Sequence, residues 1–586
     1  MQNQWIFKRL SPDEQEKQTS IANALGISSV MAKLLVQRGI YTFDDAKSFF
    51  RPDLDQLHDP FLIKDMQKAV DRLNKACENK EKILIYGDYD VDGTTAVALV
   101  YKFLQDCGCP SQLDFYIPDR YKEGYGLSRE GVDYARDNSV KLIITLDCGI
   151  KAIERVEYAS SLGIDVIICD HHTTDEILPA AVAVLDSKRA DDTYPYKDLS
   201  GCGVGFKFMQ AFAISNNIDF SHLESLLDFV AVSIASDIVP ITGENRILAY
   251  YGIKRLNEHP SKGLKAIIDT CIPSNNRGHK DQAPQEITMN DIVFKIGPRI
   301  NASGRMKSGR EVVELLVAND DTLAVQISNN IDAYNEERRG IDKVTTAEAE
   351  SIILKQGDIE NRRSIVVFNP DWHKGIVGIV ASRLTEKYYK PTIVLTEANG
   401  LISGSARSVH GFDLYSAIDS CRDLLENFGG HTYAAGLSLK KENLAEFTKR
   451  FEKYVTDNIQ EDQLLPQIDI DSELTLADIT PKFIRILRQF EPFGPGNTHP
   501  VFCVRRVIDH ESKSRTVGRD NEHLKLDITD NSEAGVSMNG IAFRMAEYLN
   551  LIKRKKPVDI VFTIEDNNFN GNISPQLMIR DIRISE

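Results

Sequence analysis

Residues 83–95 read ILIYGDYDVDGTT, and this stretch decides the fold of the chain. Its first four residues are apolar or aromatic, as in a buried strand, and the TTAVALVYKFLQDCG that ends the stretch and continues beyond it predicts a helix. Asp88, Asp90 and Asp92 therefore lie in a strand-to-helix turn. Carboxylates this close repel one another unless a cation lies among them, so the turn indicates a divalent metal site. Taken alone, the stretch fits an acidic, solvated turn equally well.

The composition is that of an ordinary globular protein with several domains: 586 residues, 42% hydrophobic and 27% charged. No apolar run is long enough to cross a bilayer, and the start MQNQWIFKRLSPDEQEK lacks the features of a signal peptide, so we expect a cytoplasmic protein. Nine cysteines without a CxxC pair indicate reduced thiols rather than a disulfide frame or a zinc site. The net charge of −16 argues against a nucleic-acid partner, but only weakly, because bound cations would reverse the sign at an acidic site.

Strand and helix patterns alternate after the opening stretch, which predicts a parallel sheet with helices on both faces. The predicted fold class is α/β, with two α/β lobes joined by a long helix and a C-terminal domain of short strands that form a small barrel or sandwich. We expect a helical region at 1–75 that packs on the next domain, a catalytic α/β domain at 76–265, an arginine-bearing loop and connector helix at 266–355, a second α/β domain at 356–460 and a strand-rich domain at 461–586.

Three further apolar segments of the first α/β domain end in acids or histidines. KLIITLDCG ends near Asp147, IDVIICDHH ends in Asp170, His171 and His172, and LLDFVAVSIASDIVP runs into Asp237. Each alone has a structural explanation, such as a helix cap or a core histidine. Because parallel strands deliver their carboxyl ends to one crevice, we expect these side chains to converge with the first three acids on a metal site.

The ligand types predict the metal and the chemistry. Carboxylates with imidazole and no thiolate suit manganese or magnesium. This many anionic ligands fit two ions better than one, and paired ions of this kind catalyse phosphoester or phosphoanhydride hydrolysis.

Other stretches offer groups for a phosphate-bearing substrate. IPDRYKEGYGLS carries Arg120 and Tyr125, and the glycine-rich SGCGVGFKFMQ at 200–210 could accept an anion at a helix N-terminus or simply allow tight packing. DIVFKIGPRINASGRMKSGR has no apolar periodicity, which predicts a loop that uses arginine on phosphate. Its candidate residues are Arg299, Asn301 and Arg305.

In the second α/β domain, the run SGSARS contains Ser405 and Arg407, and Gly429-Gly430 precedes His431. Hydroxyls, backbone amides and an arginine together indicate a phosphate cradle, although such glycines can also just form turns. In the C-terminal domain, basic residues between 505 and 525, with Phe493 and Phe502, could form a groove for single strands. An ordinary solvated face explains the same basic residues nearly as well, because acids are interleaved with them.

Several motifs together resemble the RecJ family, single-strand-specific exonucleases of the DHH phosphoesterase superfamily. The resemblance covers nearly the whole chain, in order. It is carried by DYDVDG at 88–93, LDCG around Asp147, CDHH at 169–172, ASDIVP around Asp237, GPRINASGRM at 297–306, WHKGIVGIVASR at 372–383, SGSARS at 403–408 and FGGHTYAAG at 428–436.

The resemblance implies a 5′ to 3′ exonuclease that releases 5′-mononucleotides from single-stranded DNA with manganese or magnesium, in repair and recombination. It implies a monomer whose barrel is an OB-fold, with single-strand-binding protein and a helicase as further partners. Asp170 would orient the site, His172 would face the scissile phosphate, and Arg299 and Arg305 would steady that phosphate. The implied metal ligands are Asp88, Asp90, Asp92, Asp147, His171 and Asp237. The residues implied to hold the 5′ end or the strand behind it are Arg120, Ser405, Arg407 and His431.

Two other functions stay open. One is a phosphodiesterase of the same superfamily that acts on short oligonucleotides or cyclic dinucleotides, which the extra C-terminal domain disfavours. The other is a non-catalytic single-strand-binding relative, which the complete acid set disfavours. We assign no role to the polar insert near 272–286.

Overall fold

A computed structural model describes residues 3–272, 286–398, 400–530, 535–554, 556–569 and 572–585. All but the two end residues of the insert near 272–286 therefore lie outside the described residues. The chain forms two compact units, a small unit of Met1–Ile6 with Ala333–Asp469 and a large unit of Phe7–Asp332 with Ile470–Glu586. Among the described helices, none is both long and apolar enough to span a membrane.

The large unit contains a five-stranded parallel sheet, as predicted, in the order β3-β2-β4-β5-β6. Its strands are β2 (Ile83–Gly87), β3 (Leu113–Tyr116), β4 (Leu142–Leu146), β5 (Asp165–Cys169) and β6 (Ala183–Leu185). The first strand, β2, lies between β3 and β4, so the order of strands reverses there. This is the point of an open α/β sheet at which ligands usually bind.

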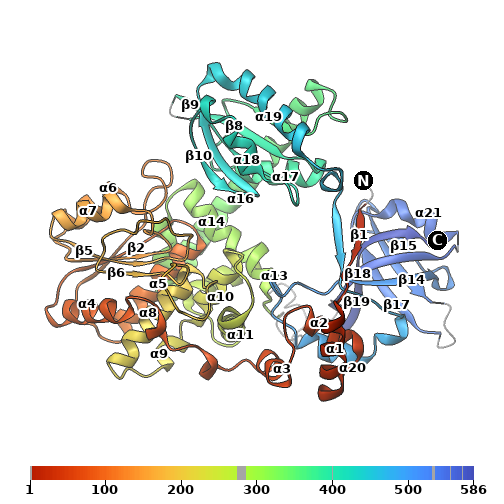
Figure 1. The fold of residues 1–586 in the computed structure, drawn as a ribbon, viewed down its shortest axis with the longest axis horizontal. Coiled ribbons are helices and arrows are strands. Elements are labelled where there is room, and N and C mark those ends of the chain that lie inside the picture. Colours follow the sequence, from red (N-terminus) through yellow and green to blue (C-terminus); the bar gives the residue numbers. More distant parts are fainter. Residues whose placement is uncertain are drawn as a thin grey trace. The chain divides into compact units, whose positions relative to one another are not determined.

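Helices cover both faces of this sheet (Figure 1). They include α4 (Met66–Glu78), α5 (Val91–Asp106), α6 (Arg129–Asp137), α7 (Ile153–Ser161) and α8 (Gly201–Ser215). Along β2, Ile83 and Ile85 join the hydrophobic core with α4, α5 and α8, whereas Leu84 and Tyr86 join the core with α6 and α7. This alternation follows from the two-residue period of a strand and explains why the strand sequence is continuously apolar.

A run of helices follows the sheet. They are α9 (Ser221–Glu224), α10 (Leu227–Ser236), α11 (Gly243–Glu258), α12 (Lys262–Cys271), α13 (Met289–Asp291), the π-helical η4 (Ile292–Ile296), α14 (Gly297–Met306) and α15 (Gly309–Leu316). The loop predicted around Arg299 is therefore wrong, because these residues form α14. The buried face of α14 consists of small residues and Ile300, so it shows no apolar stripe. It packs closely instead: a Cβ on Gly304 would lie 2.6 Å from the Tyr89 carbonyl oxygen.

Of the predicted N-terminal helical region, α4 packs on the next domain as predicted, but the earlier helices do not. These are α1 (Pro12–Leu25), α2 (Ser29–Val36) and α3 (Phe43–Phe50), preceded by β1 (Gln4–Phe7), which pairs with β12 (Gln467–Ile470). The buried residues of α1 to α3 share a hydrophobic core with the C-terminal barrel rather than with the domain that follows them in sequence. Sequence order alone could not show this, because the two segments are separated by more than 400 residues.

The C-terminal strands form the predicted barrel. The elements are β13 (Ser472–Glu473), α20 (Pro481–Arg488), β14 (Phe502–Asp509), β15 (Arg515–Val517), β16 (His523–Thr529), β17 (Ser537–Ala542), α21 (Leu549–Lys553), β18 (Val558–Phe569) and β19 (Asn572–Ile584). Their order is β13-β14-β18-β19-β17-β16-β15, and β14 also pairs with β16, which closes the barrel. Phe502 is fully buried in its core, so it is not the exposed stacking ring that we predicted.

The small unit is the second α/β domain. The long helix α16 (Asp321–Gln356) begins in the large unit and ends in the small one, as predicted for a connector. The sheet order is β10-β11-β9-β8-β7, with only β7 and β8 parallel. Its elements are β7 (Ile365–Phe368), α17 (Val377–Tyr388), β8 (Thr392–Ala398), β9 (Leu401–Arg407), α18 (Leu414–Asp419), β10 (Leu425–His431), β11 (Ala434–Leu439) and α19 (Leu444–Asn458).

Candidate metal centre

The first group of acids follows β2. Asp90 is the N-cap of α5, and its carboxylate accepts a hydrogen bond from the Gly93 amide at 3.1 Å. Asp92 therefore lies in the first turn of the helix, which begins earlier than the sequence predicted because aspartate is a strong N-cap. A Cβ on Gly93 would lie 2.5 Å from the Asp88 carbonyl oxygen, so only glycine permits this tight approach.

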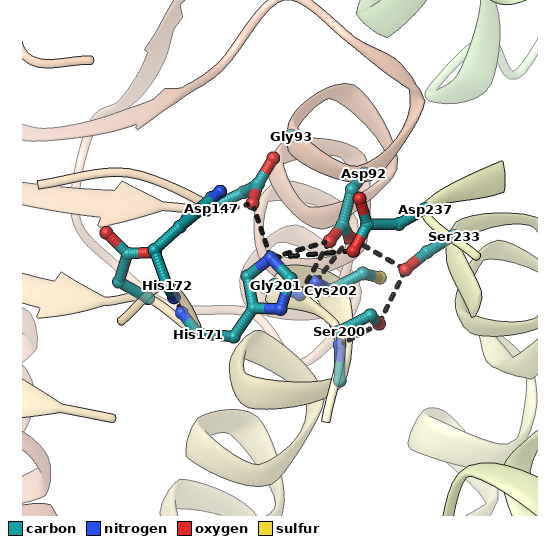
Figure 2. A network of polar contacts seen from close by, with 12 residues as sticks. Asp92, Gly93, Asp147, His171, His172, Ser200, Gly201, Cys202, Ser233 and Asp237 are labelled. Carbon is teal, nitrogen blue, oxygen red and sulfur yellow. Dashed lines mark hydrogen bonds and ion pairs between the residues drawn. The ribbon is translucent and has the colours of Figure 1, made fainter. Parts of the chain in front are cut away.

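His171 brings together acids from three elements (Figure 2). Its Nε2 lies 3.2 Å from Asp147 Oδ1, 3.5 Å from Asp237 Oδ2 and 3.7 Å from Asp92 Oδ2. The three acids follow β4, end α10 and begin α5, respectively. The structure thus places at one edge of the sheet the side chains that the sequence predicted would converge; we call them the acid edge (Asp88, Asp90, Asp92, Asp147, His171 and Asp237).

The glycine-rich first turn of α8 accepts an anion, but that anion belongs to the protein. The Asp92 carboxylate accepts hydrogen bonds from the amides of Gly201 at 2.6 Å and Cys202 at 2.7 Å and from the Ser233 hydroxyl at 2.7 Å. A Cβ on Gly201 would lie 2.5 Å from Asp147 Cβ, so glycine is required where the turn passes the acid edge. Asp92 is therefore fixed before any ligand binds.

Asp170 fixes the two histidines. Its carboxylate accepts hydrogen bonds from the amides of Ile150 at 2.9 Å and His171 at 2.7 Å, and from His172 Nδ1 at 2.8 Å. Burial alone would raise the pKa of Asp170, but these bonds and the histidine charge outweigh it and lower that pKa. An ionised carboxylate only accepts hydrogen bonds, so the proton of the neutral His172 ring lies on Nδ1.

The carboxylates of the acid edge are close together and largely buried, so the folded protein disfavours having all of them ionised. Burial, followed by the charges of neighbouring carboxylates, raises the pKa of Asp147 far above its ordinary range, and it also raises the pKa values of Asp88 and Asp90. The same causes raise the pKa of Asp237 to about 8. Burial lowers the pKa of His171, which favours the neutral imidazole. A bound cation would relieve the repulsion and accept the neutral ring nitrogen as a ligand.

The donor set fits a hard divalent cation. Within the described ranges, Asp88 Oδ1 and both ring nitrogens of His171 are buried without a hydrogen-bond partner. Two groups that share no residue each offer three ligand atoms within 4.8 Å of one another: Asp88, Asp90 and Asp147, and Asp92, His171 and Asp237. Carboxylates with one imidazole and no thiolate are the ligands of manganese or magnesium.

Two of the predicted substrate contacts lie beside the acid edge. Tyr125 Oη donates to the Asp147 carbonyl oxygen at 3.0 Å and lies 3.2 Å from His172 Nδ1. The Arg120 guanidinium stacks on the Tyr89 ring, with 4.6 Å between its Cζ and the ring centroid. Tyr89 stands between two of the acids, so Arg120 is held at the acidic turn.

The three predicted substrate-binding residues of α14, Arg299, Asn301 and Arg305, have different surroundings. Arg299 Nε donates to Asp332 Oδ1 at 2.9 Å, so this guanidinium forms an ion pair within the fold rather than standing free for a phosphate. The backbone carbonyl of Arg305 accepts a hydrogen bond from Tyr121 Oη at 2.7 Å. Asn301 is half-buried one turn before Arg305 on the same helix.

The remaining candidates form a separate group in the small unit. Arg407 Nη1 donates to Ser405 Oγ at 2.8 Å, and a Cβ on Gly378, in the first turn of α17, would lie 3.2 Å from that hydroxyl. Arg407 pairs across the sheet with Ala434, and Ala434 pairs with His431, so the side chains of Arg407 and His431 share one face. Ser405 lies two residues before Arg407 on the same strand and therefore on the same face. We call Ser405, Arg407 and His431 the cationic face.

Sequence reasoning missed several residues that hold the acid edge in place. Ser233 carries no motif of its own, and only its spacing of four residues before Asp237 on one helix face could have indicated it. The Ile150 amide, which donates to Asp170, carries no side-chain signal at all. This support became visible only in the folded chain, because its donor is a backbone group.

Comparison with known proteins gives three family matches along the chain. Residues 82–234 match the N-terminal domain of the DHH family, residues 361–457 match the DHHA1 domain and residues 470–581 match the RecJ OB domain.

Full-length relatives agree with these matches. The chain is 35% identical over 584 residues to a protein of Bacillus subtilis named single-stranded-DNA-specific exonuclease RecJ, which covers 99% of this chain and 71% of that protein. It is 33% identical over 538 residues to the protein of the same name from Escherichia coli, covering 88% and 90% of the two chains.

Solved structures show the same fold. RecJ of Thermus thermophilus in complex with Mn²⁺ is 24% identical, with a TM-score of 0.82 over 100% of this chain and 80% of that chain. An exonuclease RecJ bound to manganese is 27% identical, with a TM-score of 0.58 over 70% of this chain and 98% of that chain. Because three family models match in order and a relative 35% identical covers 99% of it, the chain belongs to the RecJ family of the DHH phosphoesterases.

Proposed function

We propose that the chain is a metal-dependent exonuclease that degrades single-stranded DNA from the 5′ end and releases 5′-mononucleotides. The observation that carries the proposal is the acid edge, where buried carboxylates surround a neutral histidine that has unused ring nitrogens. Relatives of the chain are named single-stranded-DNA-specific exonucleases, and this name fits a metal-dependent hydrolysis of phosphodiesters.

We propose two ions at the acid edge. Asp88, Asp90 and Asp147 would hold one, and Asp92, His171 and Asp237 would hold the other, because these two groups share no ligand. Such ions supply Lewis acidity at a phosphate and a more acidic water. The repulsion among six ligands, five of them acids, would be too large for a single divalent ion to balance.

The protein's own residues orient the reaction. Asp170 holds the His172 ring with a proton on Nδ1. Burial alone would lower the pKa of His172, but the contact with Asp170 outweighs burial and raises that pKa. The ring therefore keeps its positive charge to a higher pH. His172 is half-exposed and would face the scissile phosphate. Arg120 and Arg305 would add positive charge beside the reacting group. Arg299, which is paired with Asp332, would fix α14 rather than contact the phosphate.

The cationic face would hold the 5′ end of the strand. The N-terminal amides of α17 and the Arg407 guanidinium both attract anions, and Ser405 adds a hydroxyl next to them. His431 shares this face. Tyr125 and Asn301 remain proposed contacts with the strand near the acid edge.

The barrel would hold the strand farther from the cleaved end, as OB-folds do with single strands. We keep the domain bounds 76–265, 356–460 and 461–586, within which the three family matches fall. We propose action in the cytoplasm as a monomer, with single-strand-binding protein and a helicase as partners. All nine cysteines are free thiols, which fits a reducing compartment.

The test is digestion of 5′-end-labelled single-stranded and blunt duplex DNA with Mn²⁺, with and without a chelator. We expect rapid release of labelled mononucleotide from the single strand alone and none with chelator. Release from the duplex at a similar rate, or release of long fragments first, would contradict the proposal.

The same site on a small substrate is the second candidate, because the acid edge by itself fits any phosphodiester. The barrel favours long strands, since a dinucleotide needs no second contact surface. Comparing kcat/KM on a long single strand and on linear and cyclic dinucleotides decides between them. A non-catalytic role would require strand binding without hydrolysis at any Mn²⁺ concentration.

A further inference from the structure

A buried arginine joins three segments of the large unit that are far apart in sequence. Arg246 lies in the first turns of α11 and is 4% exposed. Its guanidinium donates hydrogen bonds of 2.8 to 3.4 Å to the backbone carbonyls of Phe49, Gln489, Phe490, Glu491 and Pro492. Its Cζ also lies 3.8 Å from the centroid of the Phe49 ring. No ion pair to Arg246 is found in the described part of the chain.

The acceptors explain how a cation is stabilised there without a carboxylate. Four of the carbonyls follow the C-terminus of α20, which ends at Arg488, where the helix dipole is negative. Carbonyl dipoles and the Phe49 ring face supply the rest of the stabilisation. Because every N–H of the guanidinium has an acceptor, neither lysine nor glutamine could reproduce this arrangement.

A second arginine and an asparagine complete the junction. Arg38 Nε donates to Asn497 Oδ1 at 2.7 Å, and Arg38 Nη2 donates to the Thr498 carbonyl at 2.7 Å. Asn497 is 1% exposed, and its amide donates to the carbonyls of Phe490 at 2.7 Å and Pro492 at 2.8 Å. We call residues 489–498, with Arg38 and Arg246, the clasp.

The clasp contacts the loop that follows a candidate metal ligand. The Ile241 amide donates to the Pro495 carbonyl at 2.7 Å. A Cβ on Gly494 would lie 2.5 Å from Ile241 Cγ1, so the Ile241 side chain packs directly against the backbone of Gly494. Ile241 stands four residues after Asp237. The chain that leaves the acid edge is therefore held by the segment that leads into the barrel.

We infer that Arg246 and Asn497 are positioning residues, which hold the barrel at a fixed offset from the acid edge so that a long strand enters the site in register. The inference rests on the proposed function and adds to it the residues that couple strand binding to cleavage. Neither residue touches the reacting phosphate. An error of about 1 Å in such positioning can cost about a hundredfold in rate, so a loose clasp affects long strands strongly.

The test compares Arg246→Gln and Asn497→Ala with Arg72→Gln. Arg72 is a matched control, because its side chain is also largely buried, with 9% exposed. It forms ion pairs with Glu81 and Asp165 at the parallel sheet that carries the acid edge, and within the described residues none of its hydrogen bonds or ion pairs reaches the clasp. We expect the clasp variants to raise KM on a strand of about 30 nucleotides by about tenfold or more, with kcat on a 5′-phosphorylated dinucleotide unchanged within about twofold. In hydrogen exchange, the Ile241 amide should lose protection in both clasp variants and keep it in Arg72→Gln.

Equal losses on long and short substrates, or a KM shift in Arg72→Gln as large as in the clasp variants, would overturn the inference. Faster exchange at Ile241 without a KM shift would do the same, because the junction would then be structural only. If Arg246→Gln does not fold, Asn497→Ala decides. If the wild type cleaves neither substrate, the proposed function fails separately, and the affinity of each variant for the long strand, measured by fluorescence anisotropy, decides whether the clasp positions a strand.

Discussion

The acid edge and the cationic face are opposite in charge and alike in one respect: each lacks a balancing charge of its own. Burial and mutual repulsion raise the pKa of Asp147, and burial lowers the pKa of Arg407. Within the described residues, the Arg407 guanidinium donates hydrogen bonds to the Ser405 hydroxyl and the Ala406 carbonyl, and both acceptors are neutral. Each site therefore favours a ligand of opposite sign, a cation in the first and a phosphate in the second.

The two sites also differ in construction. The acid edge collects single residues from the ends of parallel strands and helices, so its members are separated by up to about 150 positions in sequence. The cationic face uses β9 and β10, which each pair antiparallel with β11 between them, and residues two apart on a strand share a face. A substitution should thus disturb the acid edge through charge balance and the cationic face through local contacts.

The largest effect is expected for Asp147→Asn. Hydrolysis should fall about a thousandfold or more, because one of the two proposed ions loses a charged ligand. In chelator the variant should be more stable than the wild type by about 1 kcal/mol or more, since a buried charge among like charges is removed. Nucleotide release and thermal unfolding measure the two effects. Asp137→Asn, an acid on the exposed end of α6, is the control and should change neither. A variant that is less stable in chelator would show that the acids are held by the fold alone.

Metal and pH should act on the acid edge together. Burial and Asp92 raise the pKa of Asp237 to about 8. Between the unfolded pKa of about 4 and this folded value, the folded state keeps a proton on Asp237 that the unfolded state has lost. The contribution of Asp237 to the free energy of unfolding is therefore fully present below about pH 4 and is lost as the pH rises to about 8.

Mn²⁺ should reverse this trend, because it binds the deprotonated ligands and stabilises the folded state by about 2.7 kcal/mol at a hundred times its Kd. Thermal unfolding at about pH 5 and pH 8, with chelator or with Mn²⁺, measures both slopes. Parallel slopes in the two conditions would mean that the ion does not bind at these carboxylates.

The cationic face should discriminate between 5′ ends. Arg407→Gln should raise KM by about tenfold to a hundredfold for strands with a 5′-phosphate and leave strands with a 5′-hydroxyl nearly unchanged. Arg407→Lys should recover only part of the loss, because an ammonium cannot reproduce the planar guanidinium fork. Arg422→Gln, which removes an exposed arginine of the same unit, is the control. Equal effects on both kinds of end would contradict a 5′-phosphate site.

The sequence predicted the acid edge well because its signal is local. Asp88, Asp147, His171 and Asp237 each follow or end an apolar segment, and the rule for parallel sheets places the ends of such segments together. It predicted α14 wrongly, since a helix whose buried face consists of glycine, serine, alanine and a single isoleucine has no apolar period. The loop hypothesis also left Arg299 free, whereas the helix brings it to Asp332, 33 positions later.

The partners of the N-terminal helices could not be predicted at all. The apolar faces of α1 to α3 were visible in the sequence, but the hydrophobic effect does not specify which surface covers such a face. The barrel core that covers them lies at the other end of the chain. The clasp was hidden for a related reason. Its acceptors are backbone carbonyls, which every residue possesses, so no side-chain pattern marks Gln489 or Pro495 as contacts.

The smallest effect is expected for Ser233→Ala, which tests whether the supports of the acid edge matter separately from its ligands. The Ser233 hydroxyl donates one of three hydrogen bonds to the Asp92 carboxylate and lies 2.6 Å from Ser200 Oγ. The amides of Gly201 and Cys202 remain in the variant, so Asp92 keeps its place and loses only part of its orientation.

The Mn²⁺ concentration for half-maximal activity should therefore rise about tenfold at most, with kcat at saturating Mn²⁺ unchanged and stability lower by about 1 kcal/mol. Ser225→Ala, which removes a hydroxyl that donates to the His222 carbonyl, is the matched control and should leave the Mn²⁺ dependence unchanged. If Ser233→Ala instead lowers kcat at saturating Mn²⁺, Ser233 does more than orient Asp92. The difference between ligand and support would then be one of degree, and the acid edge would act as a single hydrogen-bonded unit from β2 to α10.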